Sequence, residues 1–307
     1  MKSTFLRSMQ IFFVLLWLTP AAFGIEFNRY HDQEEIAAYL RSEAQANPEL
    51  ARFRVLGKSQ QGREIAIVTV TKSTNPDAPG IYFNGTHHGN ERASTEAVLA
   101  LLDYLVREKD QPVVDKLLRR YRIILHPLVN PDGHALNLRT DSRGIDPNRD
   151  YETPTKSEKD AFQLVETRLV RDLLVKDKNV VASAAFHSGL EAVLWPWCHT
   201  PTLSQHDPVF RTLAGNVAKT MQVNRTSQSF YDYQTEGEFI DFAYMRHGIY
   251  ALTFEVAHEA APPASRLIAT VKRAVQGSFS FIKAVDDVLN NPQLTTPVLT
   301  GDSQASL

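Results

Sequence analysis

The stretch IYFNGTHHGNE, residues 81–91, joins a short apolar run to a polar segment that begins where the run ends. The run Ile-Tyr-Phe is typical of a strand buried in a sheet. His88 and Glu91 stand three residues apart, which lets an imidazole and a carboxylate share one divalent ion. His87 has Asn90 at that spacing and so lacks such a partner. Because the His-x-x-Glu pattern also occurs by chance, it makes a metal site only a hypothesis at this point.

Predicted strands and helices alternate on both sides of this stretch. Apolar runs predict further strands at 63–71, 121–125, 180–186 and 251–256. Apolar residues at helical spacing predict helices at 33–46, 94–107, 158–174, 209–221, 239–246 and 264–288. This alternation favours an α/β fold, a sheet with helices on both faces. We find no internal repeat and no linker, so we expect a single domain.

The composition excludes several classes of protein. The 307 residues are 43% apolar and 22% charged, which is typical of a globular chain and not of a disordered or fibrous one. The 33 Lys and Arg nearly balance the 35 Asp and Glu, so no strong positive field would attract a nucleic acid. The single cysteine, Cys198, excludes an intrachain disulfide and a Cys-rich zinc cluster.

Both ends of the chain differ from the rest. Residues 1–24 combine Lys2 and Arg7, an apolar run at 11–18 and the small-residue end Ala-Phe-Gly at 22–24, which predicts a secretory signal peptide. The alternative, a membrane anchor, would need an apolar run of about 20 residues. Residues 290–307 lack an apolar period, which predicts a disordered tail. We therefore expect a domain over 25–289 in a secreted or periplasmic protein.

Other polar residues follow the predicted strands, where open α/β sheets tend to bind ligands. His187 comes directly after the strand at 180–186. Alone it could be an ordinary hydrogen-bonded residue at a strand end. Together with His88 and Glu91 it would complete the three-ligand set of a catalytic zinc. Glu255 lies in the apolar run at 251–256, where a carboxylate is costly to bury unless it has a partner or a catalytic role.

A third segment is rich in arginine. The Asn-Pro-Asp-Gly sequence at 130–133 predicts a turn, and Arg139, Arg143 and Asp-Pro-Asn-Arg at 146–149 follow it. Such charges often form a solvated loop. If they face a metal, their guanidinium groups suit a carboxylate or an oxyanion.

In this order, these segments resemble the zinc metallocarboxypeptidases of the pancreatic carboxypeptidase A type, the M14 peptidase family, from about residue 30 to residue 288. The segment GKSQQGR at 57–63 fits the family's G-x-S-x-x-G-R pattern. The resemblance implies one catalytic domain, with a mixed, mainly parallel eight-stranded sheet and helices on both faces. It also implies one zinc ion per chain, and we expect no inhibitory propeptide because the domain begins close to Gly24.

The same resemblance implies the catalytic residues. It places the zinc ligands at His88, Glu91 and His187. Asp146 matches the aspartate that orients the first zinc histidine. Arg139 matches the arginine that polarises the scissile carbonyl, and Glu255 matches the general base that acts on a zinc-activated water.

The resemblance also implies how substrate binds. Asn148 and Arg149 match the pair that binds the terminal carboxylate of a peptide. Tyr233 matches a mobile tyrosine that closes over substrate, whereas without the resemblance it would be taken for a surface-packing residue. Ile240 matches the floor of the side-chain pocket, where an apolar residue implies a preference for aromatic or aliphatic residues. Two acidic residues could instead shift the preference toward a basic or diamino residue: Glu238 and Glu191.

These matches predict an exported zinc carboxypeptidase that hydrolyses the last peptide bond of substrates with a free C-terminal carboxylate. A murein peptide hydrolase of the same family, which cuts between D-glutamate and a diamino acid, remains an alternative. An acyl-amino-acid deacylase and an inactive binding module are two others; the turn at 130–133, Tyr233, Arg139 and Glu255 favour the peptidase. We expect a monomer that binds no nucleic acid and, after signal removal, no membrane.

Overall fold

Eight strands form one mixed sheet in the computed structural model, which describes residues 24–291. From edge to edge they are β1 (Ala51–Lys58), β2 (Glu64–Val70), β4 (Arg122–His126), β3 (Gly80–Gly85), β5 (Val180–His187), β8 (Tyr250–Ala257), β6 (Leu190–Trp195) and β7 (Thr226–Gln228). The central strands β4, β3, β5 and β8 are parallel, and β7 is parallel to β6. The pairs β1–β2, β2–β4 and β6–β8 are antiparallel. The predicted mixed, mainly parallel sheet is confirmed.

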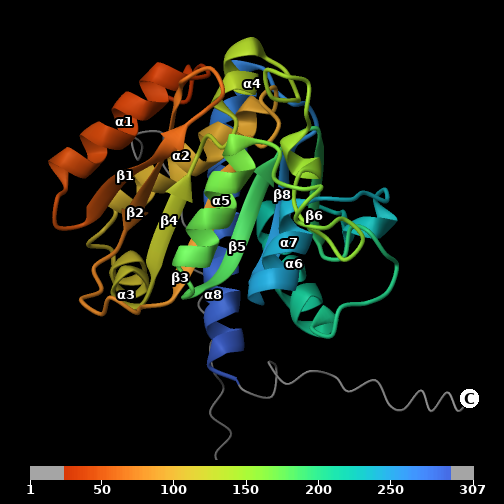
Figure 1. Cartoon of the computed structure of the whole chain (residues 1–307). Coiled ribbons are helices and arrows are strands. Elements are labelled where there is room, and N and C mark those ends of the chain that lie inside the picture. Colours follow the sequence, from red (N-terminus) through yellow and green to blue (C-terminus); the bar gives the residue numbers. More distant parts are fainter. Residues whose placement is uncertain (1–23, 292–307) are drawn as a thin grey trace, which may run out of the picture.

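Helices cover both faces of this sheet, as predicted (Figure 1). One apolar core lies between the sheet and α1 (Gln33–Ala46), α2 (Arg92–Arg107), α3 (Pro112–Arg120), α6 (Asp207–Met221) and α8 (Ala264–Leu289). A second core lies on the other face, beneath α5 (Val165–Lys176) and α7 (Phe239–His247). The central parallel strands are therefore buried from both sides, and their carboxyl ends meet at one edge of the sheet.

The structure differs from the sequence prediction in several local elements. The prediction missed β1, β6, β7, α3 and the short helix α4 (Pro131–Leu136). The Asn-Pro-Asp-Gly segment begins α4 and is not an isolated turn, because the Asn130 side chain caps the helix by accepting the N–H of Gly133. The helix predicted from 158 begins at Val165, because Phe162 has a φ of 55° and the Asp150 carboxylate accepts the N–H groups of Gln163 and Leu164.

The predicted signal peptide and most of the predicted tail lie outside the described residues, so both remain predictions. Within 24–291, none of the helices combines the length and apolar character needed to cross a membrane.

Two buried histidines should make the stability of the fold depend on pH. Burial lowers the pKa of His126 to about 3 and that of His134 to about 4, against an ordinary value of 6.5. Below pH 6.5 the unfolded chain therefore binds more protons than the folded chain, so the free energy of unfolding falls as the pH drops toward 4. Each histidine contributes at most about 1.4 kcal/mol per pH unit.

We expect the urea midpoint to fall between pH 7 and pH 5, and His126→Asn to fall less steeply than wild type. Asparagine cannot take up the proton, yet it can keep a polar partner for the Tyr82 hydroxyl, which lies 2.8 Å from His126 Nδ1. Equal slopes in the two proteins would contradict the role given to His126.

Candidate active site

The loop between β3 and α2 holds two of the predicted ligands, His88 and Glu91. Thr86 begins this loop with a φ of 62°, which is rare for a β-branched residue, and its hydroxyl is hydrogen-bonded to Ser94, Thr95 and the carbonyl of Pro127. Gly89 lies very close to Gly133 of α4. A Cβ atom on residue 89 would lie 2.0 Å from the carbonyl carbon of Gly133. These contacts fix the path of the loop over the end of the sheet.

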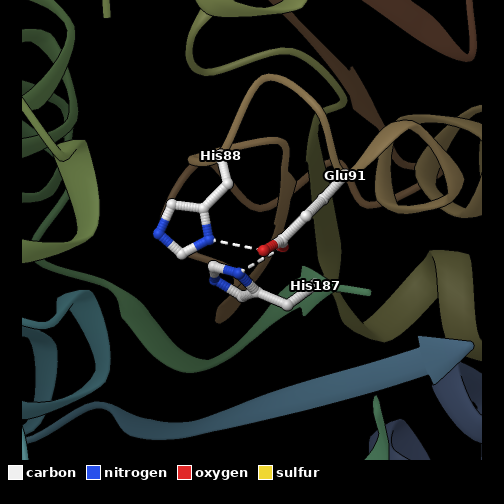
Figure 2. Close-up of side chains that lie close together, drawn as sticks. All are labelled: His88, Glu91 and His187. Atoms are coloured by element: carbon white, nitrogen blue, oxygen red, sulfur yellow. Dashed lines mark hydrogen bonds and ion pairs between the residues drawn. The ribbon is translucent and has the colours of Figure 1, made fainter. Parts of the chain in front are cut away.

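The third predicted ligand, His187, ends the neighbouring strand β5. The Nδ1 atom of His88 lies 2.7 Å from Glu91 Oε1, and the Nδ1 atom of His187 lies 2.9 Å from Glu91 Oε2. Figure 2 shows both rings turned toward the carboxylate. All three residues are buried, and one possible ligand atom from each lies within 4.8 Å of the others. They form the one such group among the residues that the structure describes.

Asp146 lies behind His88, at the start of the short 3-10 helix η2 (Pro147–Arg149). Its Oδ1 is 3.0 Å from His88 Nε2. An N–H donated by Nε2 to Asp146 leaves the lone pair of Nδ1 for a metal. Burial raises the pKa of Asp146, but His88 and the nearby arginines outweigh burial and hold the pKa well below its usual range.

Arg139 joins Asp146 to the ligand cluster. Its Nε donates to Asp146 Oδ2 at 3.1 Å, and its Nη1 lies 3.4 Å from Glu91 Oε1. The Arg139 side chain is 43% exposed, so it is accessible to an incoming group while it contacts the cluster. The structure thus brings the predicted Arg139, Asp146 and metal ligands into contact.

Glu255 lies on β8, directly beside His187 in the parallel register of β5 and β8. Burial raises the pKa of Glu255 well above its usual value, and the nearby carboxylates of Glu91 and Glu238 raise it further, while Arg139 lowers it. Its buried Oε2 has no hydrogen-bond partner. A carboxyl group with a raised pKa beside a ligand cluster suits an acid–base role.

A second arginine, Arg149, lies nearby, and its Nη1 donates to the carbonyl of Asn148 at 2.7 Å. Arg149 donates from Nη2 to the Tyr233 hydroxyl at 2.9 Å, and its Nη1 lies 3.3 Å from Glu238 Oε1. Burial lowers the pKa of Arg149, but Glu238, Tyr233 and Asp146 outweigh burial and raise it. Asn148 accepts the backbone N–H of Phe239 through Oδ1 at 3.0 Å. Tyr233 is 54% exposed, and its movement over a substrate stays a prediction.

The residue predicted for the side-chain pocket, Ile240, and the two acidic alternatives, Glu238 and Glu191, lie in different places. Ile240 is buried in the core beneath α7, two residues after Glu238, and its pocket role remains a prediction. Glu191 forms an ion pair with Arg273 of α8 at 2.5 Å. Of these two acidic residues, Glu238 contacts Arg149 and Glu191 does not, within the part of the chain that the structure describes.

Two further residues pack beside the cluster: His87, which lacks a carboxylate three residues on, and Tyr151, which no pattern in the sequence pointed to. The ring of His87 stacks on His187 with centroids 5.8 Å apart, and its Nε2 lies 2.8 Å from the Tyr151 hydroxyl. His87 stands next to a ligand and Tyr151 stands two residues after Arg149, but neither position carries a spacing signal of its own. Their contacts depend on tertiary structure.

Comparison with known proteins fits this arrangement. The family model for zinc carboxypeptidases, Peptidase M14, matches residues 36–277. The chain belongs to the zinc carboxypeptidase family. It is 26% identical over 265 residues to zinc carboxypeptidase A 1 of Anopheles gambiae, covering 75% of this chain and 60% of the relative. It is 26% identical over 226 residues to carboxypeptidase B of Astacus astacus, covering 64% of this chain and 74% of the relative.

Solved zinc carboxypeptidases share the fold. The crystal structure of carboxypeptidase A from Helicoverpa armigera superposes with a TM-score of 0.80 at 17% identity, covering 87% of this chain and 76% of that one. Some curated relatives are much longer, since the chain spans 60% of the mosquito protein and 13% of rat carboxypeptidase D.

The ligand cluster fits the zinc that the family name implies. Two imidazole nitrogens and one carboxylate are the donors of a catalytic zinc site with three protein ligands. The Nδ1 atoms of His88 and His187 both point to the Glu91 carboxylate, which supports this assignment. Asp146 accepts from the other ring nitrogen of His88, as a carboxylate commonly does for a zinc-binding histidine. His88, Glu91 and His187 would hold the ion.

Proposed function

We propose that this chain is a zinc-dependent metallocarboxypeptidase that removes the last residue of a peptide with a free C-terminal carboxylate. One observation carries the proposal: Arg139 and Glu255 border the His88–Glu91–His187 cluster, and the Arg149–Tyr233 pair stands near the same cluster through Asp146. Binding alone would not need an acid–base residue beside the cluster. An enzyme that must bind the free C-terminal carboxylate of its substrate at a fixed distance from the metal cleaves only the last peptide bond.

Zinc, when bound, lowers the pKa of a water molecule and polarises the peptide carbonyl. Glu255 accepts the proton of the attacking water and passes it to the leaving amine nitrogen. A raised pKa makes the Glu255 carboxylate a stronger base, which suits the first of these two steps. Arg139 donates hydrogen bonds to the oxygen that gains negative charge.

Arg149 binds the terminal carboxylate of the peptide, with Asn148 beside it on η2. The phenol of Tyr233 already accepts from Arg149 and lies on an exposed loop, so it can cover the bound residue and limit access of water. These side chains fix the distance between the free carboxylate and the bond that is cut.

The test is to incubate the purified protein with a mixed peptide library, and separately with murein peptides, and to read the products by mass. We expect loss of single C-terminal residues, which stops with a chelator and returns when zinc is added. Amide-capped peptides should be spared. Internal cleavage, or release that a chelator leaves unchanged, would contradict the proposal, and cleavage confined to murein peptides would favour the murein alternative.

We also propose that residues 1–24 direct export, on the charged start, short apolar run and small-residue end of that segment. Finding Met1 at the N-terminus of protein recovered from outside the cytoplasm would contradict this proposal.

A further inference from the structure

Asp103 is a fully buried carboxylate on α2 that contacts the last residue of the proposed leader, residues 1–24. The backbone nitrogen of Gly24 lies 2.9 Å from Oδ1 and 2.9 Å from Oδ2 of this carboxylate. Tyr39 and Arg107 donate to Oδ1 as well, at 2.7 Å and 2.8 Å. Among the described residues, Gly24 is therefore the one donor to Oδ2.

Removing residues 1–24 would take this donor away from Asp103, and a buried carboxylate oxygen without a donor is costly. The same cut creates a new cation, the α-ammonium group of Ile25. Backbone nitrogens of consecutive residues are less than about 4 Å apart, so this ammonium arises beside the place that Gly24 leaves. The Ile25 side chain packs against the apolar core, and its N–H has no hydrogen-bond partner within residues 24–291. No existing contact therefore directs this nitrogen away from Asp103.

The groups around Asp103 can accept one more positive charge. Glu43 of α1 lies 4.0 Å from the Nη2 atom of Arg107, so two carboxylates share one guanidinium. Burial raises the pKa of Glu43 and Asp103 raises it further, while Arg107 and Lys109 lower it. Lys109 itself donates to the Asn47 side chain at 3.1 Å. An ammonium beside Asp103 would give two positive and two negative groups in contact.

The position of the Gly24 nitrogen suits an ammonium better than an amide. A peptide N–H has one hydrogen, which the Gly24 amide shares between the two oxygens of Asp103. An ammonium has three hydrogens and can donate a separate one to each oxygen. Its positive charge also makes each hydrogen bond stronger. Tyr39 stays a neutral donor here, because burial and Asp103 raise its pKa.

We propose that the Asp103 carboxylate is the binding site for the α-ammonium group of the mature N-terminus, which leader removal creates at Ile25. The inference rests on the proposed export for its biological meaning. It is independent of the ligand cluster, since Asp103 lies twelve residues after Glu91, about 18 Å further along α2. The ion pair would fasten the start of the mature chain to α2 once the leader is gone.

The test measures the pKa of the Ile25 α-amine by competitive labelling with an amine reagent and mass spectrometry. The protein is made by cutting a fusion directly before Ile25, and the same chain unfolded in urea gives the reference, expected at about 7.7–8.0. We expect the folded protein to exceed this reference by about one unit or more, because a nearby carboxylate favours the charged amine. Asp103→Asn should remove the shift. The control Asp110→Asn, an exposed carboxylate paired with Lys72, should keep it.

Equal pKa values of the amine in the folded and unfolded wild type would overturn the proposal without any variant, since water would then have replaced Gly24. A shift that survives in Asp103→Asn would overturn the role of Asp103. So would loss of the shift in Glu43→Gln, which decides the matter if Asp103→Asn does not fold. Met1 on the exported protein would contradict the proposed export alone, because the fusion-derived protein still reports on Asp103.

Discussion

Replacing Glu255 with glutamine is expected to lower kcat/KM by about a hundredfold to ten-thousandfold, the range typical of losing a general acid–base group. Glutamine has nearly the same shape but cannot accept or release the proton. Burial and neighbouring carboxylates raise the pKa of Glu255, which shows that this position disfavours a negative charge, so an uncharged amide should not destabilise it. We therefore expect the variant to fold and to bind zinc as wild type does, as measured by metal analysis and thermal melting.

The control is Glu191→Gln on the adjacent strand β6. That substitution also removes one carboxylate, but from an ion pair with Arg273 outside the site, so kcat/KM should stay close to the wild-type value. Near-full turnover by Glu255→Gln would show that another group moves the proton and would contradict the mechanism.

Replacing Arg149 with alanine should give the second large effect, on peptides with a free C-terminal carboxylate. Removing one partner of a buried charge pair costs about 2–5 kcal/mol, which corresponds to a fall of about thirtyfold to several-thousandfold in kcat/KM. Peptides with a C-terminal amide make no such pair and should lose far less. The measurement is the ratio of kcat/KM for matched acid and amide peptides.

Two further variants sharpen this result. Arg149→Lys keeps the charge but not the planar fork, so its ratio should fall between those of wild type and Arg149→Ala. Arg54→Ala removes an exposed arginine of β1 and should leave the ratio unchanged. An equal fall for acid and amide peptides in Arg149→Ala would indicate general damage to the site and not loss of carboxylate binding.

The central strands and the residues at their ends were predictable from sequence. The strands at 81–83, 180–186 and 251–256 are mostly apolar because both faces of β3, β5 and β8 are buried, and such runs are easy to recognise. The polar residues that interrupt or follow them, His88, His187 and Glu255, therefore stood out.

The outer elements were not predictable in the same way. In β1 the exposed Arg52 and Arg54 alternate with half-buried residues, and β7 has only three residues, so neither carries a strong apolar signal. The start of α5 depends on Asp150, which caps a segment more than ten residues away. The choice between Glu238 and Glu191 likewise depends on the direction of each side chain, which no spacing in the sequence reveals.

Some parts of the site lie on the central strands of the sheet, and others lie on a connection outside it. The ligand cluster and Glu255 are anchored to β3, β5 and β8, in the most buried part of the fold, where a substitution disturbs the packing of both faces. Tyr233 and Glu238 lie on the connection between η3 (Ser229–Tyr231) and α7. This connection adds little to the sheet itself, so its side chains can be exchanged without moving the ligand cluster. Substitutions between Asp232 and Glu238 are therefore a way to alter the surroundings of Arg149 while the strands that carry the cluster stay unchanged.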